Sequence, residues 1–96
     1  VDDACRSIIN SFGFENNFFH RTGHNIGEEV HGPGVHMDNL ETKDERNIIK
    51  GSCFSIEPGI YLRGENGFRT EIDVIITNSG EVEVAGEIQS KIIPLL

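Results

Sequence analysis

Two glutamates in neighbouring predicted strands have the right type and spacing to share a metal ion. Glu57 and Glu71 lie in segments whose side chains alternate between apolar and polar, the pattern of a strand with one buried face. The Gly-Glu-Asn-Gly cluster at 64–67 predicts a turn that joins the segments as an antiparallel hairpin. A hairpin centred on Gly64 puts the two glutamates directly opposite each other, and a centre elsewhere in the cluster shifts that pairing by up to about three residues.

A histidine in the preceding loop could complete this candidate site. Two carboxylates that point at one spot repel each other unless a proton or a cation lies between them. His24 belongs to the stretch 18–34, in which the many glycines predict loop and short extended segments rather than a helix. Two oxygens and one nitrogen suit Mn, Zn, Co or Fe. Taken singly, each glutamate is also explained as a solvated strand residue and the histidine as a surface residue, so the prediction depends on all three converging.

The opening segment predicts an amphipathic helix. Its apolar residues recur at helical spacing: Ala4, Ile8, Ile9 and Phe12. Asp2 or Asp3 is available to cap the start of this helix, and Gly13 can end it in a left-handed conformation.

The second half of the sequence predicts a sheet. The expected strands are 52–61, 68–77 and 81–85, and residues 38–50 before them predict a surface loop or a marginal helical turn. In the first two strands one face is apolar and the other polar: Phe54, Ile56, Phe68, Thr70, Ile72 and Val74 against Ser55, Glu57, Arg69, Glu71 and Asp73. We therefore expect an α+β fold, an antiparallel sheet with one N-terminal helix packed on it.

Length and composition limit the class of protein. The 96 residues suit one domain, 1–96, and 36% hydrophobic with 25% charged residues is typical of a globular chain. The net charge of −8 argues against nucleic acid and against an anionic membrane surface as partners, because both need a positive patch. No apolar run approaches the roughly 20 residues that span a bilayer. Because the chain starts at Val1 and a helical pattern begins at once, we expect it to be cut from a longer protein.

Two cysteines and one further histidine predict no additional site. Cys5 and Cys53 show no CxxC or zinc-finger spacing, and Cys53 lies in a predicted buried strand as a packed thiol. This pattern favours a reducing compartment, and we expect the cytoplasm. His36 is interpreted as a surface residue.

Three blocks of sequence closely resemble the M24 metallopeptidase family, which has the creatinase/aminopeptidase "pita-bread" fold. The blocks are His20-x-x-Gly23-His24-x-Ile26-Gly27 with Val30-His31, then Ser55-Ile56-Glu57-Pro58-Gly59-Ile60-Tyr61, then Arg69-x-Glu71-x-Asp73. Within the family the sequence is most similar to Xaa-Pro aminopeptidases and prolidases. The resemblance covers nearly the whole chain and implies the C-terminal half of the pita-bread fold.

The resemblance implies a site for two divalent metal ions, with Mn expected first and Co or Zn as alternatives. His24 and Glu57 would ligate one metal ion, and Glu71 would bridge both. Glu57 would also serve as the acid/base group. The implied reaction is hydrolysis of the peptide bond that precedes proline, with the metal ions lowering the pKa of water and polarising the carbonyl group.

The resemblance also implies roles for three residues outside the ligand set. His31 would hydrogen-bond the scissile carbonyl or the tetrahedral intermediate, and His20 would help hold the substrate near its proline. Arg69 would anchor the carboxylates. The implied partner is a peptide with proline at the second position.

The family site also needs two aspartates from strands upstream of the matched region. Asp2 and Asp3 cannot be these residues, because they open the helix that follows those strands. Four carboxylates neutralise two divalent ions, but Glu57 and Glu71 balance only one. We therefore expect the 96 residues alone to bind metal weakly, to be inactive, and to pair with another copy or expose an apolar patch. The alternatives are a creatinase-like or methionine-aminopeptidase-like hydrolase, or a non-catalytic pita-bread module that binds peptides or proteins.

Overall fold

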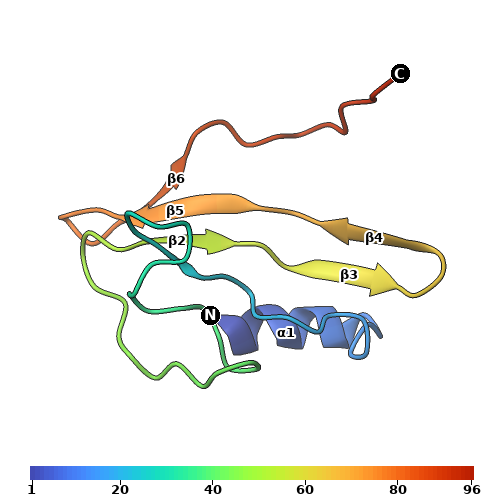
Figure 1. The fold of residues 1–96 in the computed structure, drawn as a ribbon, viewed down its shortest axis with the longest axis horizontal. Helices are drawn as coiled ribbons and strands as arrows, with labels where there is room; N and C mark the ends of the chain where they lie inside the picture. Colours follow the sequence, from blue (N-terminus) through green and yellow to red (C-terminus); the bar gives the residue numbers. More distant parts are fainter.

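The structure is a computed structural model that describes residues 1–96, with one helix and strands that all pair antiparallel (Figure 1). Helix α1 (Asp2–Ser11) comes first. The strands are β1 (Asn25–Ile26), β2 (Cys53–Ile56), β3 (Gly59–Leu62), β4 (Asn66–Arg69), β5 (Ile72–Ile76) and β6 (Val82–Ala85). One sheet has the order β1-β2-β5-β6, and β3 and β4 form a two-stranded sheet. The predicted α+β class, with one N-terminal helix and antiparallel sheets, is confirmed.

Each of the two long predicted strands is broken once, and the two breaks face each other across the hairpin. The first ends as β2 at Ile56 and resumes as β3, and the second ends as β4 at Arg69 and resumes as β5. Pro58 lies at the break and has no N–H to donate, which interrupts the ladder of hydrogen bonds. The amide of Thr70 still donates to the Pro58 carbonyl (3.2 Å), so the hairpin runs on across the break. The prediction of two continuous strands was therefore wrong at this point.

The register of the hairpin is the one that places the two glutamates opposite each other. Ile56 pairs with Ile72, and Gly59 pairs with Arg69, so both sheets share one centre at Gly64. Gly64 has a φ of 81°, which L side chains rarely adopt. The glutamates at 57 and 71 therefore occupy facing positions on the two arms, which is the outcome expected for a hairpin centred on Gly64.

The hydrophobic core is small, because only 14 of the 96 residues are buried. It joins two loop residues to the inner face of the sheet: Val35, Met37, Phe54 and Val74, with Ile56, Ile72, Ile76 and Val84 packed around them. The predicted apolar face of the hairpin is thus confirmed along β2 and β5. Phe68 departs from it with 65% of its surface exposed, because β4 extends beyond the core.

Helix α1 lies in the predicted segment but does not have the predicted cap. Its N-cap is Val1, which makes no side-chain cap hydrogen bond, so the capping role given to Asp2 or Asp3 was wrong. Gly13 follows the helix with a φ of 84°, in the predicted left-handed conformation. Two residues of the expected apolar face, Ile8 and Phe12, are 62% and 75% exposed. The helix therefore buries its apolar stripe only in part.

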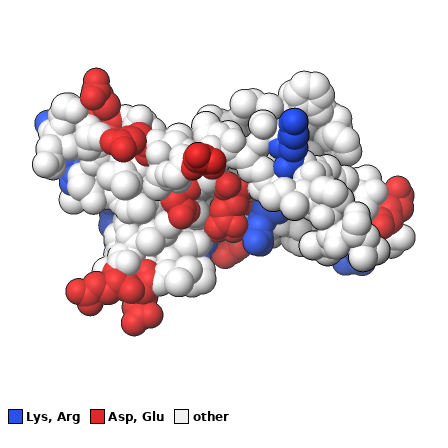
Figure 2. Space-filling model, turned by 90° about the horizontal axis from the view of Figure 1, so that it is seen from above, with Lys and Arg blue, Asp and Glu red and all other residues white.

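An apolar groove of about 420 Å³ lies where α1 faces the β3–β4 sheet. Its apolar lining comes from both elements and the segment after the helix: Ile9, Phe14, Ile60, Leu62 and Phe68. Such a surface agrees with the expected apolar patch, and pairing with another copy stays a prediction. Acidic side chains are widely spread over the face seen in Figure 2. The single helix of the structure is too short and too polar to cross a membrane.

Candidate functional site

The short strand β1 brings the histidine loop against the hairpin. Asn25 pairs with Phe54, and the amide of Ser55 donates to the His24 carbonyl (2.9 Å). One step along, the amide of Glu57 donates to the Thr22 carbonyl (2.7 Å). A Cβ at Gly23 would overlap the Ser55 carbonyl, so this close approach requires glycine. The loop and the first arm of the hairpin therefore run side by side at the candidate site.

The side chains of His24 and Glu57 meet at this junction. His24 Nε2 lies 3.1 Å from Glu57 Oε1, and their side chains are only 8% and 15% exposed. Ser55 joins them, because its hydroxyl donates to Glu57 Oε1 (3.0 Å) and accepts from the His24 amide (3.0 Å). Two of the three predicted ligands are therefore in direct contact.

Hydrogen bonding fixes which nitrogen of His24 carries the proton. Nδ1 lies 3.0 Å from the Asn25 carbonyl, and a carbonyl only accepts, so Nδ1 donates. In the neutral ring Nε2 then presents a lone pair to Glu57 Oε1, which is also an acceptor. Two acceptors at this separation need a proton or a cation between them. This pair fits a metal ion by its donor chemistry.

The third predicted ligand is connected through an arginine. Arg69 Nε lies 3.8 Å from Glu57 Oε2, and Arg69 Nη2 lies 3.6 Å from Glu71 Oε2. The side chains of Arg69 and Glu71 are 53% and 45% exposed, so these ion pairs are weak. No group of three or more His, Cys, Asp or Glu side chains is arranged to hold a metal ion. The structure thus brings two predicted ligands together and leaves Glu71 on the facing arm, beside the arginine predicted to anchor it.

The two other predicted histidines differ in their surroundings. His31 is exposed, and its ring packs against the His24 ring with centroids 4.2 Å apart. His20 donates from Nδ1 to the Arg21 carbonyl (2.8 Å), so its Nε2 accepts from the hydroxyl of Tyr61 (2.7 Å). His31 is therefore open to a ligand, whereas both nitrogens of His20 already have partners.

His36 is not the free surface residue that the sequence predicted. It is half-buried, and its Nδ1 accepts a hydrogen bond from the Asn25 amide (2.9 Å). Burial, with the positive charges of Arg21 and Arg46, lowers the pKa of His36. A neutral ring is what an accepting nitrogen requires, so His36 has a structural role in the loop.

Asp2 is the residue beside the site that sequence reasoning missed. Its carboxylate is buried and accepts from Thr22 N (2.9 Å), Thr22 Oγ1 (2.6 Å), Asn39 N (2.9 Å) and Arg6 Nη2 (3.0 Å). Burial alone would raise the pKa of Asp2, but these hydrogen bonds outweigh it and the pKa is lowered. Arg6 also donates to the carbonyl of His20 (2.9 Å). The one signal in the sequence was the i,i+4 spacing of Asp2 and Arg6.

The N-terminal helix and the antiparallel sheets have the fold of a part of the pita-bread metallopeptidases. Residues 1–78 match the metallopeptidase family M24, and the chain belongs to that family. A Xaa-Pro dipeptidase of Lactobacillus delbrueckii subsp. lactis is 39% identical over 80 residues, which is 83% of this chain and 21% of the relative.

Two solved structures are similar to the chain. The dipeptidase PepE of Mycobacterium ulcerans has a TM-score of 0.81 and 33% identity, over 96% of this chain and 24% of its own. The X-Pro aminopeptidase of Thermotoga maritima has a TM-score of 0.76 and 35% identity, over 86% of this chain and 22% of its own. The chain thus spans between a fifth and a quarter of the length of these relatives.

Proposed function

We propose that this chain supplies part of the active site of a metallopeptidase that hydrolyses the peptide bond before proline, as an aminopeptidase or a dipeptidase. The observation that carries the proposal is the contact of His24 Nε2 with Glu57 Oε1 at 3.1 Å, in which two acceptors face each other. Relatives named as Xaa-Pro dipeptidases and an X-Pro aminopeptidase support the substrate class.

In this proposal His24, Glu57 and Glu71 hold divalent metal ions, which Mn, Co or Zn would provide. Bound metal ions would lower the pKa of water and polarise the scissile carbonyl group. The hydroxyl of Ser55 donates to Glu57 Oε1 and so orients that carboxylate. Glu57, mostly shielded from solvent, is the group that moves a proton between water and the leaving amine.

The remaining residues would act on the substrate and on the carboxylates. His31 is exposed beside His24, where its ring can donate a hydrogen bond to the scissile carbonyl. His20 has both nitrogens engaged, which favours packing of its ring against proline rather than a hydrogen bond to the substrate. Arg69 lies within 3.8 Å of both glutamates and neutralises part of their charge.

Replacement of Glu57 in the longer protein that contains this chain tests the proposal. Glu57→Gln keeps the size of the side chain but removes its charge and its basicity, so hydrolysis of Xaa-Pro peptides should fall by at least about 100-fold with Mn, Co or Zn supplied. Glu83→Gln, an exposed glutamate of β6, is the matched control and should leave the rate unchanged. Full activity of Glu57→Gln contradicts the proposed role.

The choice of substrate separates the alternatives. A wild-type protein that cleaves Met-initiated peptides or creatine, but not Xaa-Pro peptides, is another hydrolase of the family. A wild-type protein with no hydrolytic activity in any of the three metals is a binding module.

The 96 residues alone should bind metal weakly and turn over no peptide. Glu57 and Glu71 balance the charge of a single divalent ion, and metal binding depends on such ligand charge. Calorimetric titration with Mn²⁺ should therefore detect at most one weak site. Two tight sites on the 96 residues would contradict this expectation.

A further inference from the structure

The loop that carries His31 is tied together at its two ends. The amide of Asn25, at the start of the loop, donates to Nδ1 of His36 at its end (2.9 Å). The side-chain oxygen of Asn25 accepts from the amide of Gly34 (2.9 Å), and its backbone carbonyl accepts from the amide of Gly32 (2.9 Å). Asn25 therefore contacts the loop through its main chain and its side chain.

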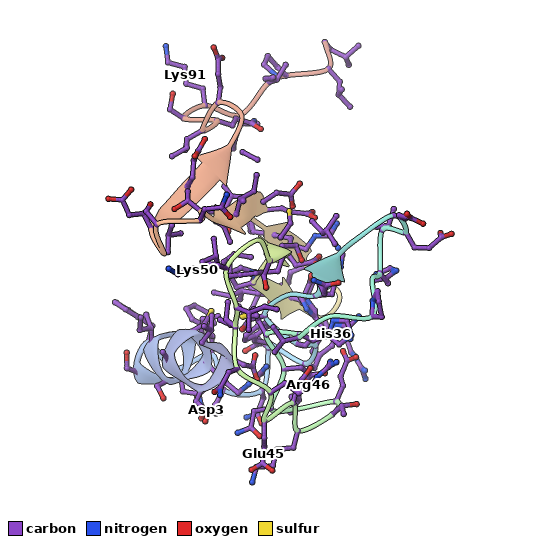
Figure 3. The ribbon with its side chains drawn as sticks, turned by 90° about the vertical axis from the view of Figure 1, so that its left-hand side faces the viewer. Asp3, His36, Glu45, Arg46, Lys50 and Lys91 are labelled. Carbon is purple, nitrogen blue, oxygen red and sulfur yellow. The ribbon has the colours of Figure 1, made fainter.

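A second pair of residues closes these contacts into a ring. The amide of His36 donates to Asp44 Oδ2 (2.8 Å), and Arg46 Nη2 donates to the same oxygen (2.7 Å). Arg46 Nη2 also donates to the carbonyl of Gly34 (2.7 Å), which returns the ring to its start. Figure 3 shows His36 and Arg46 on the same part of the molecule. We call this ring the loop clamp: Asn25, Gly34, His36, Asp44 and Arg46.

The loop clamp is rigid because it is tightly packed and contains an ionised pair. A Cβ at Gly34 would overlap the side-chain amide of Asn25, so no space is left between them. The guanidinium of Arg46 holds the pKa of Asp44 well below its usual range, which keeps that carboxylate ionised as an acceptor. Hydrogen bonds to ionised groups are about twice as strong as neutral ones.

The clamp is also attached to the hairpin arm that carries Glu57. Asn25 Nδ2 donates to the carbonyl of Cys53 in β2 (3.0 Å), and the Asn25 carbonyl accepts from His24 Nδ1 (3.0 Å). One residue thus sets the tautomer of His24 and fixes the end of the His31 loop. The His31 ring itself is exposed, so its place beside His24 depends on the loop.

We propose that the loop clamp is a positioning device that holds the His31 ring against the His24 ring. Its members contact the loop and not the reacting atoms, so they are positioning residues. The clamp is inferred from the geometry alone, whereas its effect on turnover rests on the proposed function. His36, to which the sequence assigned no role, is a member of the clamp and joins Asn25 to Asp44.

Arg46→Gln in the isotopically labelled 96-residue chain tests the clamp by NMR. The substitution removes the fork that joins Asp44 to the Gly34 carbonyl, and the Arg46 side chain is 55% exposed, so the sheet should be unaffected. The nuclear Overhauser effect between the rings of His24 and His31 should fall at least twofold, while the amide signals of β2 and β5 stay in place. Lys43→Gln, which removes an exposed cation three residues before Arg46, should leave that effect unchanged. An unchanged ring-to-ring effect in Arg46→Gln overturns the proposal.

Arg46→Lys decides the outcome if Arg46→Gln disturbs the sheet. Lysine keeps the charge but lacks the fork, so intact strand signals with a weakened ring-to-ring effect support the clamp. Intact strand signals with the full effect overturn it. Loss of the strand signals in both variants also overturns it, because Arg46 would then support the whole fold rather than the loop.

Kinetics of the longer protein extend the test to turnover. Arg46→Gln should lower kcat about 10-fold or more with little change in KM, because a misplaced catalytic group costs rate rather than binding. A wild-type protein without hydrolytic activity refutes the proposed function and leaves the NMR result to decide the clamp. An unchanged kcat in Arg46→Gln overturns the link between the clamp and turnover.

Discussion

The histidine-bearing segment 18–46 and the hairpin 53–76 both contribute to the candidate site, and different interactions hold them. The hairpin is held by a ladder of backbone hydrogen bonds in one register from β2–β5 to β3–β4. The segment 18–46 has only the two-residue strand β1. Besides a few backbone bonds, such as the bridge between Gly23 and Met37, three buried or nearly buried carboxylates hold it, those of Asp2, Asp38 and Asp44.

Each of these carboxylates accepts several backbone N–H groups at once. Asp38, for example, accepts from the amides of Leu40, Glu41 and Thr42, and so closes a turn without a helix. A ladder distributes its stability over many equivalent bonds, whereas a loop of this kind concentrates it in a few side chains. The half that carries the histidines should therefore be far more sensitive to single substitutions than the half that carries the glutamates.

The largest expected effect comes from Asp2→Ala. The substitution leaves Arg6 without its buried partner and removes the acceptor of the Thr22 and Asn39 amides. Loss of one partner of a buried ion pair costs about 3–5 kcal/mol. Urea titration should show this decrease in the free energy of unfolding, and Asp3→Ala should cost about 1 kcal/mol or less, because its bond from Asn39 Nδ2 (2.7 Å) is exposed. Equal decreases in the free energy of unfolding for the two substitutions would show that the buried carboxylate of Asp2 does not stabilise the segment 18–46.

The contribution of Asp2 should also depend on pH. Its pKa in the folded chain is lowered from 3.8, so its stabilisation is fully present above that pH. It is lost as the pH falls below 3.8 toward the lowered pKa of the folded state. The gap in unfolding free energy between wild type and Asp2→Asn, measured by urea titration, should therefore be constant from about pH 7 to 5 and narrow near pH 3. A gap that widens in acid would have the wrong sign for this mechanism.

A smaller decrease in the free energy of unfolding is expected for Ser55→Ala, where the segment 18–46 meets the hairpin. Ser55 is fully buried and bridges the His24 amide and Glu57 Oε1. Ser55→Ala leaves one buried donor and one acceptor without this partner, which costs about 1–3 kcal/mol of unfolding free energy. Ser90→Ala, at an exposed position, is the control for the measurement by urea titration. Identical midpoints for the two variants would show that the bridge contributes nothing.

The smallest effect is expected in the hairpin turn. Gly64→Ala puts a Cβ at a φ of 81°, with no other atom within 4 Å, so only the backbone conformation is penalised. That penalty is about 1 kcal/mol. Thermal unfolding of Gly64→Ala beside Glu65→Ala measures it, since Glu65 lies in the same turn. A decrease in the free energy of unfolding as large as that of Asp2→Ala would mean that the hairpin is as sensitive to single substitutions as the segment 18–46.

The sequence determined the features that local patterns encode. Alternation of apolar and polar residues and the turn at Gly64 predicted the facing positions of Glu57 and Glu71, and spacing predicted α1. The alternation of side chains continues across Pro58, so it does not report the break between β2 and β3. The blocks around His24 and Glu57 also predicted the family, because they combine ligand types with a fixed order along the chain.

Only the tertiary structure decided the roles of Asp2, Ser55 and His36. Asp2 bonds to Asn39, 37 positions away, and Ser55 bonds to His24, 31 positions away. Periodicity reports how a side chain faces its own strand or helix, and it carries no information on which distant backbone N–H a carboxylate or an imidazole will accept. Those partners are selected when the loop closes on the sheet, since every buried polar group must then find one.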